Sequence, residues 1–75
     1  MDKRLSEISA GSRVRIKAFE DDEIVLKLME MGCLPGEEIS VEKVAPLGDP
    51  ISIIVSGYHL SLRLDEASKV IVEQV

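Results

Sequence analysis

The chain has 75 residues, of which 45% are hydrophobic and 31% are charged, with nine basic against fourteen acidic side chains. This length supports one domain, residues 1–75, and the apolar content is too high for a disordered chain. A net charge of −5 has the wrong sign for neutralising nucleic-acid phosphates or anionic lipid headgroups. We therefore expect no nucleic-acid partner and no direct insertion into a membrane.

The longest uncharged apolar run is far shorter than the roughly 20 residues that cross a bilayer, and residues 1–4 lead into no signal-peptide core. The single cysteine, Cys33, has no internal partner for a disulfide, which suits a reducing compartment. These features predict a cytoplasmic protein that becomes peripheral to a membrane only through a protein partner.

The first predicted elements are a helical turn over residues 4–8, ended by Gly11, and a strand over residues 13–18. Polar and apolar residues alternate strictly along this strand, which is typical of a half-buried strand. Its cations are expected to point to solvent. Its buried face is expected to carry the apolar members, Val14, Ile16 and Ala18.

A helix is predicted from the acidic run Glu20-Asp21-Asp22-Glu23 to about Met31, because carboxylates favour the positive end of the helix dipole. At 100° per residue, an inward stripe forms from Ile24, Leu28 and Met31. Leu26 falls on the opposite side with Met29 beside it. That pair is either an ordinary exposed apolar surface or the edge of a docking patch.

Pro35-Gly36 follows the helix and leads into a strand whose alternation breaks near Glu42-Lys43, which predicts a bulge or a strand end. A turn at residues 47–50 then precedes a buried strand over residues 51–55. Ser56-Gly57 suits a two-residue hairpin loop.

The returning strand is expected to place four apolar residues on one face, namely Tyr58, Leu60, Leu62 and Leu64. A brief helical turn at residues 65–68 and a last strand at residues 69–73 complete the chain. About five short strands with one real helix predict a mainly β fold in which a strongly bent sheet closes into a small barrel.

Catalytic constellations are poorly supported by this sequence. His59 is the only histidine, no local signature pairs it with Cys33 as a thiol dyad, and neither Gly32 nor Gly36 opens a phosphate loop. We therefore predict no enzyme activity and no cofactor. A transition metal ion is the alternative, because Met29, Met31, Cys33 and His59 are soft or borderline donors. Their spacing in the sequence is not that of a metal-binding motif.

Five segments of the chain form a recognisable series. They are Leu5 through Gly11, Leu28-Met29-Glu30-Met31-Gly32-Cys33-Leu34-Pro35-Gly36, Leu47-Gly48-Asp49-Pro50-Ile51, Gly57, and Leu62-Arg63-Leu64-Asp65-Glu66-Ala67. In this order and at these separations, they resemble the FeoA family, the small cytosolic component of bacterial ferrous iron uptake systems. The resemblance spans nearly the whole chain. It implies an SH3-like β-barrel with an inserted helix and gives Cys33 no functional role.

The resemblance implies an accessory protein that binds the cytosolic part of the membrane transporter FeoB and modulates it by protein–protein contact. We expect docking on Leu26 and Met29, extended by Leu34 and Pro35 beyond the helix end, because an apolar cluster can drive association by desolvation. Arg63 is the alternative contact.

A second function class stays open, because similar domains resemble the carboxyl-terminal part of some iron-dependent repressors. The alternative is a stand-alone metal-responsive regulatory or transition-metal-binding module, although the chain has no helix-turn-helix segment of its own. The sequence leaves self-association open too.

Overall fold

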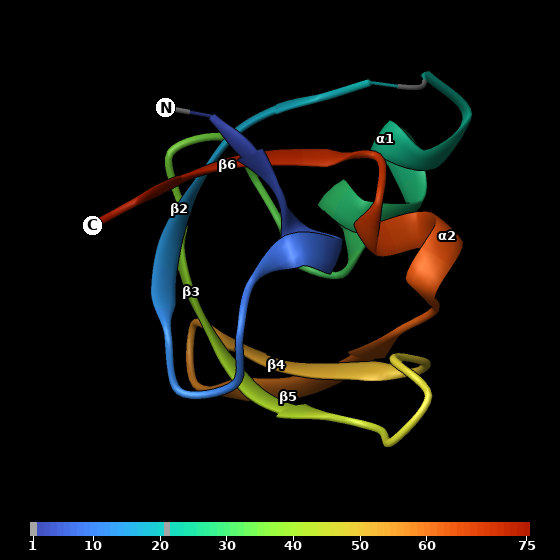
Figure 1. Cartoon of the computed structure of the whole chain (residues 1–75). Coiled ribbons are helices and arrows are strands. Elements are labelled where there is room, and N and C mark those ends of the chain that lie inside the picture. The colour runs from blue at the N-terminus through green and yellow to red at the C-terminus, as the bar shows by residue number, and fades with distance from the viewer. Residues whose placement is uncertain (1, 21) are drawn as a thin grey trace.

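The computed structural model describes residues 2–20 and 22–75, and within them six strands form one antiparallel sheet in the order β1-β6-β2-β3-β4-β5. The sheet curls around a short 3-10 helix, η1, while α1 and α2 lie side by side at the remaining side (Figure 1). The strands are β1 (Lys3–Arg4), β2 (Arg13–Phe19), β3 (Glu38–Val44), β4 (Ile51–Val55), β5 (Tyr58–Leu62) and β6 (Val70–Gln74). The helical segments are η1 (Leu5–Glu7), α1 (Asp22–Glu30) and α2 (Leu64–Ala67).

The mainly β fold with one inserted helix is confirmed, and so are the short helical turns near the two ends of the chain. The sixth strand, β1, was not predicted. It has two residues, both basic, and so carries no apolar alternation. Its pairing with β6 places Lys3 opposite Val72 and Arg4 opposite Ile71.

The strand β2 buries Val14 and Ile16 as predicted, but Ala18 is exposed, so that part of the prediction was wrong. The reason is a shift in the pairing with β6: Ile16 lies opposite Val72, whereas Ala18 lies opposite Ile71. The extra residue in β2 reverses the alternation beyond it. Phe19 therefore takes the place against the core that the pattern assigned to Ala18.

The predicted bulge in β3 is present, because the register with β4 shifts between Val41 and Lys43 and leaves Glu42 as the extra residue. The predicted hairpin between β4 and β5 is confirmed as well. Ser56 and Gly57 have φ of 50° and 82°, as a two-residue hairpin turn requires at both central positions.

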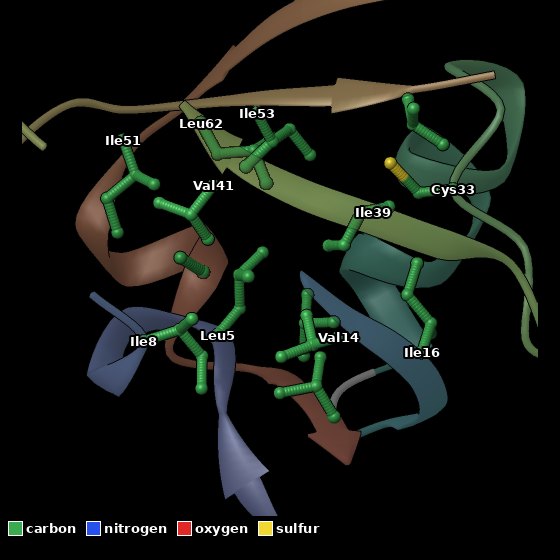
Figure 2. Packing of buried hydrophobic residues seen from close by; sticks show 14 of the residues in the cluster. Leu5, Ile8, Val14, Ile16, Cys33, Ile39, Val41, Ile51, Ile53 and Leu62 are labelled. Carbon is green, nitrogen blue, oxygen red and sulfur yellow. The ribbon is translucent and has the colours of Figure 1, made fainter. Parts of the chain in front are cut away.

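The core fills the space inside the curved sheet (Figure 2). Figure 2 shows Leu5 and Ile8 beside Val41 at one end, and Cys33 beside Ile39 at the other. α1 contributes Ile24 and Leu28, as predicted, and half-buried Met31 packs on the core just beyond the helix end. Buried residues from nearly every element thus form a single cluster.

The helix α1 begins at Asp22, two residues after the predicted start; Asp21, part of the predicted acidic run, lies outside the described residues. The acidic first turn matches the expected helix-start signal. Neither helix in the described chain is long and apolar enough to span a bilayer.

The returning strand, β5, places Tyr58, Leu60 and Leu62 on one face, as expected, whereas Leu64 lies beyond the strand in α2. Tyr58 is 69% exposed, Leu60 is half-buried, and Leu64 is 38% exposed as the first residue of α2. β5 is an edge strand, so a neighbouring strand covers only one of its two sides. Of its apolar residues, Leu62 alone is buried.

Candidate docking surface and neighbouring cleft

The outer face of α1 presents Leu26 and Met29, which are 67% and 37% exposed. Residues three apart in a helix lie on the same face, so these two side chains form neighbouring parts of one surface. Ile24 and Leu28 occupy the opposite, buried face of α1. The structure thus places both helical residues of the predicted docking surface in solvent and side by side.

The end of α1 determines where the next predicted residues lie. Gly32 has φ of 94°, its N–H donates to the Met29 carbonyl, and the Cys33 N–H donates to the Leu28 carbonyl. This is the Schellman arrangement, in which the residue after the glycine packs back on the helix. Cys33 is consequently buried, and the chain leaves the helix with Leu34 exposed.

Leu34 is 45% exposed and Pro35 is exposed, so these two members of the predicted surface extend it beyond the helix end. Arg63 lies elsewhere, directly before α2, and its side chain is exposed. We define the docking surface as Leu26, Met29, Leu34 and Pro35, with Arg63 as a separate charged contact.

The start of α2 is joined to α1 by one buried carboxylate. Glu66 Oε1 accepts a hydrogen bond from the Arg63 N–H at 2.9 Å, and Oε2 pairs with the Lys27 ammonium group. The Lys27 contact, followed by the Arg63 N–H, holds the pKa of Glu66 below its ordinary value. This carboxylate fixes the position of Arg63 relative to α1.

A cleft of about 580 Å³ opens between the loop after α1 and the β4–β5 hairpin. Ser56 Oγ and Glu37 Oε1 lie 2.6 Å apart and join its two walls by a hydrogen bond. The lining residues are Glu30, Met31, Gly32, Leu34, Glu37, Val55, Ser56, Tyr58, His59 and Leu60. Among the predicted docking residues, the cleft includes Leu34.

Sequence reasoning placed Tyr58 and Leu60 on one strand face but missed the cleft that these residues line. The available signal was their position directly after a two-residue hairpin loop, where an edge strand can extend beyond the core. Met31 was correctly expected to face inward, but it is only half-buried and contributes to the cleft wall.

The His59 ring belongs to the outer side of β5 and meets the bulge residue of β3. His59 Nδ1 lies 2.7 Å from Glu42 Oε2, which makes an ion pair when the ring is protonated. That oxygen is buried and has no partner with hydrogen-bond geometry among the described residues.

Of the soft donors considered for a metal ion, Met31 and His59 both line the cleft, whereas Cys33 lies in the core. Cys33 is 2% exposed, and burial, with a smaller contribution from Glu37, raises the pKa of its thiol and disfavours the thiolate that binds metals. His59 instead lies on the exposed edge strand. Among residues 2–20 and 22–75, no three His, Cys, Asp or Glu side chains are grouped as a metal site requires.

Solved structures share this architecture. An iron(II) transport protein A from Clostridium thermocellum is 43% identical, with a TM-score of 0.90 over 97% of this chain and 46% of that one. A Stenotrophomonas maltophilia FeoA complexed with zinc, described as a procaryotic SH3 domain protein, is 29% identical, with a TM-score of 0.83 over 95% of this chain and 89% of that one. The fold is thus an SH3-like barrel.

The same fold also occurs within a manganese-dependent transcriptional repressor, with a TM-score of 0.89 over 99% of this chain and 42% of the repressor. The identity is 13%, so this likeness concerns the fold alone.

The sequence comparisons agree with the fold. A Porphyromonas gingivalis protein in which Fe(2+) transport protein A is fused to the Fe(2+) transporter FeoB is 37% identical over 73 residues. The match covers 96% of this chain but only 9% of the fusion protein. The family model of the FeoA domain matches residues 3–74. The chain therefore belongs to the FeoA domain family, which confirms the resemblance found in its sequence.

Proposed function

We propose that this chain is an accessory protein of ferrous iron transport that binds the cytosolic part of the FeoB transporter. The observation that carries the proposal is the fusion of FeoA to FeoB in a relative that is 37% identical to this chain. A domain tethered to a transporter is held at a high effective concentration beside it. A separate chain needs a docking surface to reach the same place, at the cytoplasmic side of the inner membrane.

The docking surface supplies the contact in this proposal. Leu26, at 67% exposure, and its neighbour Met29 have apolar area that a partner can remove from water, and Leu34 extends this area toward the cleft. Burying apolar surface contributes about 25 cal/mol per Å² before the costs of association. The charged side chain of Arg63 lies apart from this cluster and contributes orientation more than affinity.

Modulation follows from binding, without chemistry in the chain itself. A ligand shifts a conformational equilibrium only when it binds the two states with different affinity. The chain therefore changes nucleotide turnover or iron passage by preferring one conformation of the transporter. It supplies no catalytic group to either process.

The test is a calorimetric titration of the purified chain into FeoB of the same cell, reconstituted in lipid nanodiscs, with Leu26→Glu as the variant. We expect Leu26→Glu to bind about tenfold or more weakly, a loss of about 1.4 kcal/mol, because the new carboxylate must lose its hydration at an apolar contact. Leu47→Glu is the matched control, since Leu47 is 92% exposed in the turn before β4 and lies outside the docking surface.

Two results would contradict the assignment of this surface. Leu26→Glu with unchanged affinity would exclude the outer face of α1, and equal losses in Leu26→Glu and Leu47→Glu would indicate a general charge effect. Arg63→Ala tests the alternative contact, and a role for this cation predicts weaker binding chiefly at low salt.

A metal-responsive regulatory module is the second candidate, supported by the zinc complex of the Stenotrophomonas maltophilia relative. Calorimetry of Zn²⁺ and Fe²⁺ with the chelator-treated chain separates it from the first. Saturable metal binding, or a gel shift of DNA by the chain alone, would favour this candidate over an accessory protein that acts only by contact.

A further inference from the structure

The strand β5 leaves one of its two edges unpaired. It is the last strand in the sheet order and pairs only with β4 within the described chain (Figure 1). The two-residue loop makes Val55 and Tyr58 the closing hydrogen-bonded pair, and hydrogen-bonded pairs then recur at every second residue. The N–H and C=O groups of His59 and Ser61 consequently point away from β4.

The cleft runs up to this open edge. Consecutive residues of a strand point to opposite faces, so a cleft lined by Tyr58, His59 and Leu60 meets the strand at its edge. The apolar part of the cleft is formed by half-buried Met31 and Leu60 and by exposed Leu34 and Tyr58. Its volume of about 580 Å³ is in the range of ligand pockets, roughly 300–1,000 Å³.

The charges around the cleft define the occupant. Glu30 and Glu37 are the acidic residues of its lining, and no Lys or Arg is present there. Glu30 forms no ion pair with any residue in the described part of the chain, and the chain carries a net charge of −5. A second copy would bring the same acidic rim and the same net charge to the contact. The occupant is therefore a basic segment of another protein.

The two edges of the sheet differ in how they resist pairing. β1 is two residues long and consists of Lys3 and Arg4, which are features that discourage added strands. β5 has five residues, Tyr58–Leu62, with no Lys, no Pro and no bulge in its pairing to β4. Only β1 thus carries the usual protection.

We propose that the open edge of β5 accepts an extended, basic segment of a partner protein as an added strand. The added strand pairs with the outward N–H and C=O groups of His59 and Ser61, and its alternate apolar side chains enter the cleft beside Leu34 and Leu60. At about 3.3 Å per residue, four or five residues of the partner span β5. This inference rests on the proposed function and specifies the chemistry of the partner segment that the chain recognises.

The test is an NMR titration of the ¹⁵N-labelled chain with the capped peptide acetyl-Lys-Val-Lys-Val-Lys-Val-Lys-amide. We expect saturable shifts of the amides of His59, Ser61 and Leu34. A peptide of the same sequence that is N-methylated at alternate residues keeps its side chains but loses its backbone donors, and we expect it to bind about tenfold or more weakly. The acidic analogue with Glu in place of Lys is expected to give no saturable shift, because it meets the carboxylates of the cleft.

Two variants of the chain locate the binding edge. Ser61→Pro removes an N–H that points away from β4, so the ladder with β4 stays intact and peptide binding is lost. Ser61→Thr is the matched control and is expected to bind like the native chain. Glu30→Lys tests the acidic rim, with weaker binding expected. An amide spectrum with native dispersion shows that each variant is folded.

Equal binding of the N-methylated and unmodified peptides would overturn the added-strand proposal, and so would shifts that bypass β5. A dimer detected by sedimentation, with His59 and Ser61 at its interface, would assign the edge to a second copy and overturn it too. Transporter binding that Ser61→Pro leaves unchanged overturns this inference while the docking proposal stands. If the chain binds the peptide but does not bind FeoB, the added-strand inference stands and the docking proposal is overturned.

Discussion

The Cys33 thiol lies in the core with 2% of its surface exposed, directly after the glycine that ends α1. In the sequence it was a candidate for a dyad with His59 and for a soft metal ligand. The turn at Gly32 directs Cys33 against Leu28, while the only histidine lies on the edge strand. The residue types suggested a thiol dyad or a metal ligand, but the buried position of Cys33 opposes both roles.

Burial raises the pKa of the Cys33 thiol above its ordinary value of 9.0. The reactive thiolate is therefore scarce at neutral pH, and the thiol is also shielded by the core. We expect slow labelling by a disulfide reagent in the native chain, rapid labelling in concentrated urea, and a native rate that still rises with pH above 9.0. A native rate equal to that in urea would show that the thiol is accessible.

At the scale of elements, α1 has one leucine on its buried face and one on its exposed face. Leu28 is fully buried and Leu26 is 67% exposed on the same helix. We expect Leu28→Ala to lower the free energy of unfolding by about 2–5 kcal/mol, and Leu26→Ala to change it by less than about 0.5 kcal/mol. Urea unfolding measures both, and similar losses would contradict the assignment of the two helix faces.

The pairing of α1 with α2 depends on the carboxylate of Glu66, which is 9% exposed. We expect Glu66→Ala to lower the free energy of unfolding by about 1–3 kcal/mol, because the Arg63 N–H and the Lys27 ammonium group lose their acceptor. Glu66→Gln is expected to lose less, since its amide oxygen still accepts from the Arg63 N–H.

The effect of Glu66 depends on pH. Its pKa in the folded chain is below the ordinary 4.5, so its ionised form stabilises the fold fully above that pH. This stabilisation is lost as the pH falls through the lower folded value. The stability difference between the native chain and Glu66→Gln should therefore be constant near neutral pH and shrink in acid. A difference that grows in acid would contradict the lowered pKa.

Local patterns predicted most elements because each rests on a near-neighbour rule. Alternation identified β2 and β4, and the Ser56-Gly57 loop identified the hairpin. The error at Ala18 arose where tertiary pairing decides the outcome. A bulge in the pairing of β2 with β6 exposes this residue, and local alternation does not reveal the bulge.

The candidate site was predictable in part for the same reason. Helical periodicity placed Leu26 and Met29 on the outer face of α1, and the turn after Gly32 is consistent with an exposed Leu34. The cleft could not be predicted, since its walls come from the end of α1 and from β5, which are far apart in the sequence. Only the closure of the barrel brings them together.

At the scale of the whole molecule, a chain of 75 residues with an SH3-like barrel has exposed apolar surface and an open strand edge on separate elements. A domain of this size buries only about 60% of the surface of its unfolded chain, so partner contact adds to a small margin of stability. Both features favour association with something larger. The fusion of FeoA to FeoB in a relative supports the transporter as that partner.

The most direct test of this account is the affinity of the purified native chain for FeoB of the same cell in lipid nanodiscs, measured by calorimetric titration. The account predicts saturable binding with one site per transporter chain and a changed rate of nucleotide turnover by FeoB once the site is filled. Absence of saturable binding by a folded chain, with turnover unchanged, would contradict it.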